Sequence, residues 1–315
     1  MKNFTSVNDV PDVLKLIEEA RSMKANPFAY KAYGENKTLG LLFFNPSLRT
    51  RMSTQRAAQN LGMNVISLNF QNDGWQLELE DGTVMDQGAQ EHIREAAAVV
   101  SQYCDVIGLR AFPSLQNRED DYEDRVLKKF IAHATVPVLS LESSILHPLQ
   151  SLADLITIAE YQKKSRPKVV LTWAPHPKAL PQAVANSFAE WIQHYPADFC
   201  IANPAGFDLA HEFRKDVQVF HNQDEALAEA DFVYVKNWSS YENYGQIGRG
   251  FEDWMVTTEK LKLANEDAKV MHCLPVRRNV VISDSVLDSD TSLVIEQANN
   301  RTFSAQTVLL NLLKA

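Results

Sequence analysis

Short apolar runs rich in β-branched residues alternate with longer amphipathic stretches along almost the whole chain. The runs have the length of buried strands, and the stretches between them are long enough for helices. Strands are predicted at residues 38–44, 64–68, 105–110, 136–141, 168–174, 198–202, 217–221, 232–236 and 269–274. Because such alternation is typical of parallel sheets covered by helices on both faces, the sequence predicts an α/β fold.

The predicted strands fall into a group of four and a group of five, which indicates two doubly wound parallel-sheet domains. The apolar periodicity breaks just before Pro148, so we place the first domain at residues 1–144 and the second at residues 145–301. Helices are predicted at residues 52–61, 91–104, 125–134, 151–163, 182–194 and 304–313. Because ligands bind at the carboxyl ends of strands in such folds, we expect the active site in the cleft between the two domains.

Charge and cysteine content exclude several classes of protein. A net charge of −9 argues against a nucleic-acid partner, which a basic patch would bind, but leaves room for an anionic substrate held by local arginines. Cys104, Cys200 and Cys273 form no Cys-x-x-Cys pair, which fits a reducing compartment and no structural zinc. The first residues contain no apolar core of a signal peptide. No segment approaches the run of about 18 apolar residues that a membrane-spanning helix needs. The sequence therefore predicts a cytoplasmic protein without a membrane partner.

Residues 47–51, Ser-Leu-Arg-Thr-Arg, stand between a predicted strand and a predicted helix. A polar turn that opens a helix presents free backbone N–H groups and the positive end of the helix dipole to an anion. The hydroxyls of Ser47 and Thr50 and the guanidinium groups of Arg49 and Arg51 add donors suited to phosphate. Without a Gly-Lys-Ser/Thr ending the segment is not a Walker loop, and by itself it is more typical of a capped surface helix.

Two further segments give this turn its context. His147-Pro148-Leu149-Gln150 lies mid-chain, and residues 272–279 read His-Cys-Leu-Pro-Val-Arg-Arg-Asn. The order and spacing of the three segments resemble those of the aspartate/ornithine carbamoyltransferase family. The resemblance extends over nearly the whole chain. The usual family form of the first segment is Ser-Thr-Arg-Thr-Arg, and Leu48 in its second place is similar to the branch that acts on N-acylated ornithines.

The resemblance implies a reaction, its partners and the place of the C-terminal helix. Carbamoyl phosphate and an N-acylated ornithine would be the substrates, with transfer of the carbamoyl group to the δ-amine. No metal and no organic cofactor would take part. The helix at residues 302–315 would cross back to pack on the first domain.

The resemblance also implies a carbamoyl phosphate site drawn from all three segments and two further arginines. Its residues are Ser47, Leu48 (through its backbone), Arg49, Thr50, Arg110, His147, Gln150, Cys273, Leu274 and Arg301. Arg110, His147, Cys273 and Thr50 would assist catalysis, because the tetrahedral intermediate needs preorganised donors. From the residues alone, Arg110 could equally form a surface ion pair, and a histidine beside a proline is more often structural. Cys273, in a predicted strand end, is expected to be an unreactive thiol rather than a covalent nucleophile.

A second implied site holds the acceptor. Its residues are Trp75, Gln90, Glu142, His176, Asn186, Lys236, Leu274 and Arg278. Without the resemblance, a lysine at a strand end such as Lys236 is usually solvated, and Glu142 could be a capping or solvated acid.

Position 90 bears on the acyl group of the acceptor. The resemblance implies a glutamate there in acetyl-specific relatives and a proline in succinyl-specific ones, whereas this chain has Gln90. A succinyl group adds a carboxylate, which neutral Gln90 would not repel and to which it could donate a hydrogen bond. Gln306 stands where the acetyl branch has a lysine. Both departures favour N-succinylornithine over N-acetylornithine, which stays the alternative.

Trp75 follows Gly74 in a loop, where a tryptophan is either an anchor or a lid over a ligand. In the N-acylornithine branch this loop reaches the active site of a neighbouring subunit, which implies a homotrimer.

Two rival functions remain. A carbamoyltransferase for free ornithine or aspartate is disfavoured, because the Asp-x-x-x-Ser-Met-Gly run of the ornithine enzymes is absent. A non-catalytic phosphate-ligand-binding protein would tolerate loss of His147, Gln150 or Cys273, yet all three are present. No Gly-x-Gly-x-x-Gly follows a predicted strand, which disfavours a dinucleotide enzyme.

Overall fold

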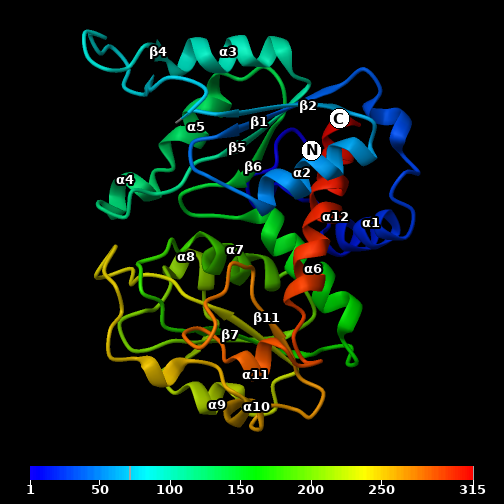
Figure 1. The fold of residues 1–315 in the computed structure, drawn as a ribbon, viewed down its shortest axis with the longest axis vertical. Helices are drawn as coiled ribbons and strands as arrows, with labels where there is room; N and C mark the ends of the chain where they lie inside the picture. The colour runs from blue at the N-terminus through cyan, green and yellow to red at the C-terminus, as the bar shows by residue number, and fades with distance from the viewer. Residues whose placement is uncertain (71, 315) are drawn as a thin grey trace. The chain divides into compact units, whose positions relative to one another are not determined.

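The computed structural model describes residues 1–70 and 72–314. These residues form two compact units (Figure 1). Unit 1 comprises the described residues of 1–113, 119–149 and 301–314, and unit 2 comprises residues 114–118 and 150–300. Each unit is built around its own parallel sheet, so the predicted α/β class is confirmed. The domain limits given above, 1–144 with 302–315 and 145–301, stay a prediction.

The sheet of unit 1 has four parallel strands in the order β2-β1-β5-β6. The strands are β1 (Thr38–Phe43), β2 (Asn64–Asn69), β5 (Val106–Arg110) and β6 (Val138–Glu142). Every residue of β5 and β6 is buried, as expected for strands covered on both faces. The chain turns in opposite directions from the neighbouring strands β1 and β5, so their carboxyl ends at Phe43 and Arg110 form a switch point suited to a ligand.

Helices cover the sheet of unit 1. α3 (Ile93–Tyr103) and α5 (Arg125–His133) pack their apolar side chains against the buried residues of β1, β5 and β6. α1 (Val13–Ala25), α2 (Arg49–Asn60) and α12 (Val294–Leu313) lie side by side, and α12 contacts both of the others through side-chain hydrogen bonds (Figure 1). The shorter helical segments are Val7–Asp9, Lys31–Gly34 and α4 (Arg118–Tyr122).

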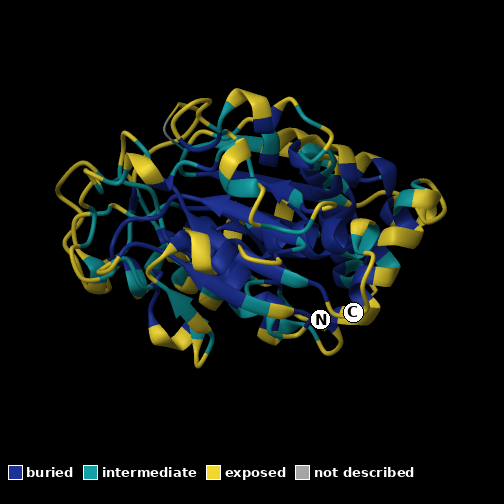
Figure 2. Ribbon diagram, turned by 90° about the horizontal axis from the view of Figure 1, so that it is seen from below, coloured by how far each residue is buried: buried dark blue, intermediate teal, exposed yellow. Residues whose placement is uncertain are grey.

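The sheet of unit 2 has five parallel strands in the order β11-β10-β7-β8-β9. The strands are β7 (Lys168–Trp173), β8 (Asp198–Ala202), β9 (Gln218–Phe220), β10 (Phe232–Lys236) and β11 (Lys269–Met271). Here the switch point lies between β7 and β10, whose carboxyl ends are Trp173 and Lys236. The strands β1, β5, β6, β7 and β10 are almost wholly buried, and such buried strands are dark blue in Figure 2, whereas β2 and β9 contain no buried residue.

The helices of unit 2 are mostly short. They are α6 (Pro148–Tyr161), α7 (Ala183–Ile192), α8 (His211–Arg214), α9 (Gln223–Leu227), a 3-10 turn at Glu252–Trp254, α10 (Thr258–Leu261) and α11 (Asp284–Leu287). α7 is buried along almost its whole length, in agreement with its largely apolar composition.

The prediction of strand structure through Leu274 was wrong, because β11 ends at Met271. The backbone leaves the sheet where His272 N–H donates to the side chain of Gln297 and Leu274 N–H donates to the imidazole of His272. These side-chain acceptors replace the ladder partners that a strand would need. Cys273 and Leu274 therefore lie in a turn after the strand.

For two helices the predicted first residue lies too late in the sequence. α2 starts at Arg49 rather than residue 52, and α12 starts at Val294 rather than residue 304. Polar residues near the start of α12 weaken its periodicity in the sequence, yet Asn300 is buried and donates to Thr157 and Glu160 of α6. Such packing contacts extend a helix beyond what propensity alone indicates.

A two-stranded parallel ladder in unit 1 has no counterpart in the predictions. β3 (Leu77–Glu78) pairs with β4 (Glu91–His92). Strands of two residues are too short to show a period of two.

Candidate active site

The predicted phosphate cradle lies at the carboxyl end of β1 in unit 1. Leu48 is the residue that caps α2, and its side chain is 69% exposed and makes no capping hydrogen bond. The first N–H groups of the helix therefore receive no acceptor from Leu48, which is what a bound anion requires. Asn45 in the preceding loop accepts a hydrogen bond of 2.7 Å from Phe112 N–H, and Phe44 N–H donates to the Arg110 carbonyl. The loop after β1 is thus fixed to the end of β5.

Arg110 ends β5 as a buried cation. Its Nη2 lies 3.0 Å from Oε2 of Glu142, and its guanidinium stacks 4.4 Å from the centre of the Phe112 ring. Burial lowers the pKa of Arg110, the neighbouring Arg49 lowers it further, and Glu142 opposes both. Arg49 and Arg110 therefore repel each other, and a phosphate dianion between or beside them would remove that repulsion.

A chain of polar contacts continues from Glu142 through His147 to the cradle. His147 Nε2 lies 3.5 Å from Glu142 Oε2 and 3.3 Å from Arg301 Nη1, and Arg301 Nη2 donates to Thr50 Oγ1 at 3.2 Å. The guanidinium of Arg301 can only donate hydrogen bonds, so its contact requires that Nε2 of His147 carries no proton. The carboxylate of Glu142 only accepts, so its contact favours a proton on the same nitrogen. His147 is thus held between a donor and an acceptor. Thr50, Arg110, Glu142, His147 and Arg301 form one buried cluster in unit 1, which we call the charged cluster.

Unit 2 contains the other predicted carbamoyl contacts. Gln150 is buried on α6 and donates through Nε2 to Asp154 at 2.7 Å. Cys273 is half-buried in the turn after β11. Leu274 has a φ of 44°, a left-handed conformation that is unfavourable for leucine and needs support from its surroundings.

Most predicted acceptor residues also lie in unit 2. Lys236 is buried at the end of β10, where its Nζ donates to the Asn237 carbonyl at 2.9 Å. Asn186 is fully buried on α7. His176 follows the end of β7, and its Nε2 accepts a hydrogen bond of 3.1 Å from Arg277 Nε. Burial lowers the pKa of His176, a hydrogen bond with the Lys178 backbone opposes this, and the nearby cations Lys236, Arg277 and Lys178 lower the pKa further. The net shift is downward, which favours the neutral imidazole.

Arg278 occupies a different environment from these residues. Its guanidinium is exposed and forms ion pairs with Asp284 at 2.9 Å and Asp288 at 2.6 Å. Its neighbour Arg277, which the sequence analysis did not single out, is the arginine beside His176. The role of Arg278 stays a prediction.

Trp75 and Gln90 come together at one end of the β3–β4 ladder. The Trp75 indole donates to Oε2 of Glu91 at 2.8 Å, and Gln90 N–H donates to the Gln76 carbonyl at 3.1 Å. Trp75 is 48% exposed, and Gln90 is also exposed. We call the described residues 72–92, which carry this ladder, the arm.

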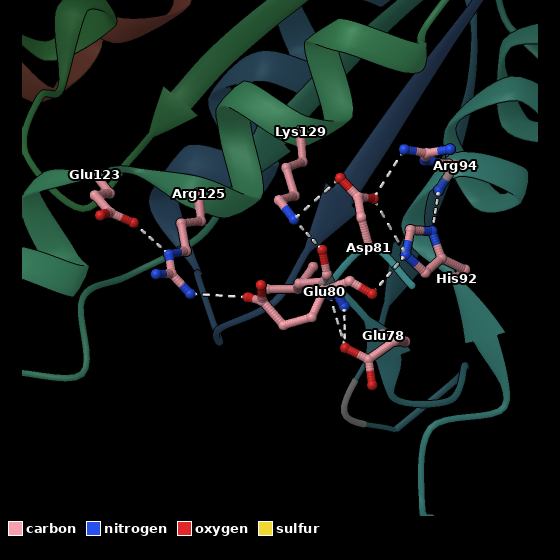
Figure 3. Close-up of polar contacts among 9 residues, drawn as sticks. Glu78, Glu80, Asp81, His92, Arg94, Glu123, Arg125 and Lys129 are labelled. Atoms are coloured by element: carbon pink, nitrogen blue, oxygen red, sulfur yellow. Dashed lines mark hydrogen bonds and ion pairs between the residues drawn. The ribbon is translucent and has the colours of Figure 1, made fainter. Parts of the chain in front are cut away.

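Ion pairs connect the arm to α3 and α5 (Figure 3). Asp81 lies 3.0 Å from Arg94 of α3 and 4.0 Å from Lys129 of α5, and Glu80 lies 2.8 Å from Arg125. The arm is therefore attached to the rest of unit 1 by these surface ion pairs and by Leu77, which belongs to the buried core cluster with Ile93 of α3 and Phe130 of α5.

Gln306 of α12 is fully buried rather than open to a ligand. Its Oε1 accepts from Asn60 Nδ2 at 2.9 Å, and its Nε2 donates to the Pro27 carbonyl at 2.6 Å. Both ends of the amide are used within unit 1, which gives Gln306 a packing role.

The part of the chain that the structure describes holds no group of three or more His, Cys, Asp or Glu residues arranged to bind a metal ion. Within residues 1–70 and 72–314 there is also no helix with the length and apolarity to cross a membrane.

Comparison with known families matches both parts of the chain. The family described as aspartate/ornithine carbamoyltransferase, carbamoyl-P binding domain, matches residues 2–160. The family described as aspartate/ornithine carbamoyltransferase, Asp/Orn binding domain, matches residues 181–312.

Individual relatives match along the full length. The chain is 48% identical to the N-succinylornithine carbamoyltransferase of Bacteroides thetaiotaomicron, over 100% of this chain and 99% of the relative. It is 35% identical to the N-acetylornithine carbamoyltransferase of Xanthomonas axonopodis pv. citri, over 98% of this chain and 96% of the relative.

A solved structure is similar in fold as well as in sequence. It is the crystal structure of an N-acetyl-L-ornithine transcarbamylase in which one glutamate is replaced by alanine, complexed with carbamyl phosphate and N-succinyl-L-norvaline. The TM-score is 0.94 at 34% identity, over 99% of this chain and 100% of that chain. The charged cluster at the end of β5, the two family matches and these full-length similarities lead to one conclusion: the chain belongs to the aspartate/ornithine carbamoyltransferase family.

Proposed function

We propose that this protein transfers the carbamoyl group of carbamoyl phosphate to the δ-amine of N-succinylornithine, giving N-succinylcitrulline and phosphate, as a step of arginine biosynthesis. The observation that carries the proposal is the charged cluster, in which buried Arg110 and Arg301 lie with His147 beside the start of α2. Two buried guanidinium groups at a helix start are suited to the dianion of an acyl phosphate.

Carbamoyl phosphate would bind with its phosphate on the cradle. Ser47, the Leu48 backbone, Arg49 and Thr50 would hold the phosphate oxygens, and Arg110 and Arg301 would add charge. Residues 47–50 follow β1 and Arg110 ends β5, at the switch point of the unit 1 sheet, and Arg301 of α12 reaches them through its hydrogen bond to Thr50, which supports this role. We assign phosphate binding to residues 1–144 with 302–315 and acceptor binding to residues 145–301.

The carbamoyl group would be held by His147, Gln150, Cys273 and Leu274. The neutral δ-amine attacks the carbamoyl carbon, and negative charge develops on the carbamoyl oxygen, where Arg110, His147 and Thr50 are the proposed donors. The intermediate then collapses: the bond from carbon to the bridging oxygen breaks, phosphate leaves with the electron pair, and the nitrogen loses a proton. The chemistry requires positioning and charge stabilisation from the protein.

The ornithine part of the acceptor would be bound by Glu142, His176, Asn186, Lys236, Leu274 and Arg278. The buried ammonium of Lys236 and the neutral imidazole of His176 suit a carboxylate and an amide respectively. Since Arg278 is already paired with Asp284 and Asp288, its contribution requires exchange of these partners for the substrate.

Succinyl is preferred over acetyl for two reasons. Full-length identity to an N-succinylornithine carbamoyltransferase is 48%, against 35% to an N-acetylornithine enzyme. Gln90 is exposed on the arm and uncharged, so a succinyl carboxylate would meet a possible donor and no repulsion. N-Acetylornithine carbamoyl transfer is the second candidate, supported by the fold similarity to that branch.

The proposal also includes the assembly of the protein and its location in the cell. We propose a homotrimer in which the Trp75 loop of one subunit reaches the site of the next, in the cytoplasm. The exposure of Trp75 on the arm supports the first part, and three free cysteines support the second. Sedimentation equilibrium of the protein and of Trp75→Ala would test the assembly, and a monomeric wild-type protein would contradict it.

The test of the function is phosphate release from carbamoyl phosphate with ornithine, N-acetylornithine and N-succinylornithine offered separately. Turnover confined to N-succinylornithine is the expected result. Preference for N-acetylornithine would make the second candidate correct. Binding of carbamoyl phosphate without turnover on any acceptor would favour the non-catalytic binding protein.

A further inference from the structure

A single buried carboxylate in unit 2 receives two primary amides. Asp154 lies on α6 and is fully buried. Its Oδ1 accepts from Gln150 Nε2 and from Gln297 Nε2, each at 2.7 Å. An ionised carboxylate only accepts hydrogen bonds, so neither amide can turn its own oxygen toward Asp154 without repulsion. Asp154 therefore determines which way both glutamines face.

The orientation of Gln150 determines which atom lies at the other end of its side-chain amide. Since Nε2 points to Asp154, Oε1 points in the other direction along the side-chain amide plane. That oxygen is an acceptor, which is what the NH₂ of a carbamoyl group requires. A Gln150 amide turned by 180° would present NH₂ to NH₂ instead, and the contact would be lost.

Gln297 carries the same constraint to the turn after β11. With Nε2 on Asp154, its Oε1 accepts from His272 N–H at 2.9 Å. The His272 ring then accepts from Leu274 N–H at 3.0 Å. These two hydrogen bonds fix the turn that contains Cys273, and they support the left-handed backbone conformation of Leu274.

Tyr234 of β10 completes the surroundings of the carboxylate. Burial raises the pKa of Tyr234 well above its ordinary value, and the neighbouring Asp154 and Cys273 raise it further. The phenol therefore stays protonated and remains a donor beside the carboxylate. Gln150, Gln297 and Tyr234 thus each have a hydrogen-bond donor that the Asp154 carboxylate can orient.

We propose that Asp154 is a positioning residue, whose carboxylate sets the amide orientation of Gln150 and, through Gln297, the backbone of the Cys273–Leu274 turn. Its catalytic consequence rests on the proposed function, because the oriented groups are those that would contact the carbamoyl group. The orientation itself is independent of any substrate.

The first experiment reads the orientation directly, by NMR exchange of the side-chain amide protons of Gln150 and Gln297. The signals are assigned by their loss in Gln150→Glu and Gln297→Glu. In the wild type we expect slow exchange of both groups. In Asp154→Leu, which is similar in size but has no acceptor, we expect exchange at least about tenfold faster. Unchanged exchange of both amides would overturn the proposal.

The second experiment measures turnover and phosphate binding together. Asp154→Leu should lower kcat by about 100-fold, because misplaced contacts at a reacting centre have effects of that size. Asp154→Asn, which keeps one acceptor oxygen, should recover part of this loss. Inhibition by inorganic phosphate should stay unchanged in both variants, since phosphate would bind unit 1. Equal losses of phosphate binding and turnover would indicate general disruption and contradict the proposal.

A matched control and a second variant keep the test decisive. Thr157→Val removes another buried polar group of α6, which donates to the Ala153 carbonyl at 2.7 Å, and should lower stability without the loss of kcat. Should Asp154→Leu fail to fold, Asp154→Asn carries both measurements, and Gln297→Met carries the measurements of turnover and phosphate inhibition. A wild-type protein inactive on every acceptor would refute the proposed function, while the amide exchange would still decide the role of Asp154.

Discussion

Unit 1 and unit 2 both bury polar side chains beyond the ends of their strands, but they do so with different chemistry. The charged cluster of unit 1 contains two guanidinium groups, a carboxylate and an imidazole. The Asp154 network of unit 2 consists of one carboxylate, two amides and backbone donors. The first suits a charged phosphate, and the second suits the uncharged carbamoyl group.

The difference also predicts how each region responds to mutation. Removing one member of a buried ion pair leaves the other charge uncompensated, at about 3 kcal/mol or more. In unit 2, loss of one amide leaves the Asp154 carboxylate with its other donor, and one hydrogen bond to a charged group contributes about 1.5–3 kcal/mol. Unit 1 should therefore lose more stability than unit 2 when one member of its network is removed.

The largest effect is expected for Arg110→Met. Glu142 would lose its guanidinium partner, so the free energy of unfolding in urea should fall by about 3 kcal/mol. Turnover should fall by about 1000-fold, because a donor to the oxyanion is also lost. Arg110→Lys, which keeps the charge, is the control and should lose less of both. A fully stable Arg110→Met protein would remove the contrast between the two units.

His147→Ala should come next. Its kcat should fall by about 100-fold with little change in the KM for carbamoyl phosphate, because the imidazole acts on the transition state. Steady-state kinetics with both substrates varied gives the two constants. A raised KM with unchanged kcat would show that His147 only binds substrate, and that the cluster is a phosphate site without a catalytic part.

Gln90→Glu extends the comparison to the exposed arm. A negative charge near a succinyl carboxylate should lower kcat/KM for N-succinylornithine by about tenfold and leave N-acetylornithine unaffected. Gln90→Ala is the uncharged control, so a loss shared by both variants would point to a lost hydrogen bond instead of repulsion. Equal kinetics on both acceptors in every variant would show that position 90 does not select the acyl group.

The smallest effect is expected for His176→Gln in unit 2. Because the pKa of His176 is lowered on folding, its neutral form contributes stability above the ordinary value of about 6.5, and this is lost as pH falls through the folded-state pKa. In urea unfolding, the wild type should therefore lose stability relative to His176→Gln as the pH is lowered below about 6.5. A difference that grows in the opposite direction would mean that the imidazole is charged in the fold.

The strand pattern was sufficient to predict the α/β fold and to place Arg110 and Lys236 at strand ends. Parallel strands end at one edge of a sheet, so chain order alone brings such residues near a switch point. The spacing of Gln150 and Asp154, four residues apart on one helix, was also a readable signal for their contact.

Other features depend on contacts that no local pattern records. Gln297 donates to Asp154 across 143 residues of sequence, and its other amide end accepts from His272 N–H where β11 has ended, before Cys273. Likewise, the choice between Arg277 and Arg278 as the neighbour of His176 is decided by Asp284 and Asp288, which hold Arg278 elsewhere. Both follow from tertiary structure.

The two long helices α6 and α12 have a consequence for how this protein can change its acceptor over evolution. The chain enters the main segment of unit 2 at residues 149–150 and leaves it at residues 300–301, and both of these passages fall inside the two helices; the short segment 114–118 also belongs to unit 2. An α-helix turns about 100° per residue, so a recombination event that adds or removes one residue at either passage would rotate every side chain after it. Exchange of unit 2 as a cassette between relatives therefore has to preserve helical phase at both junctions, whereas point substitutions on the exposed arm face no such constraint.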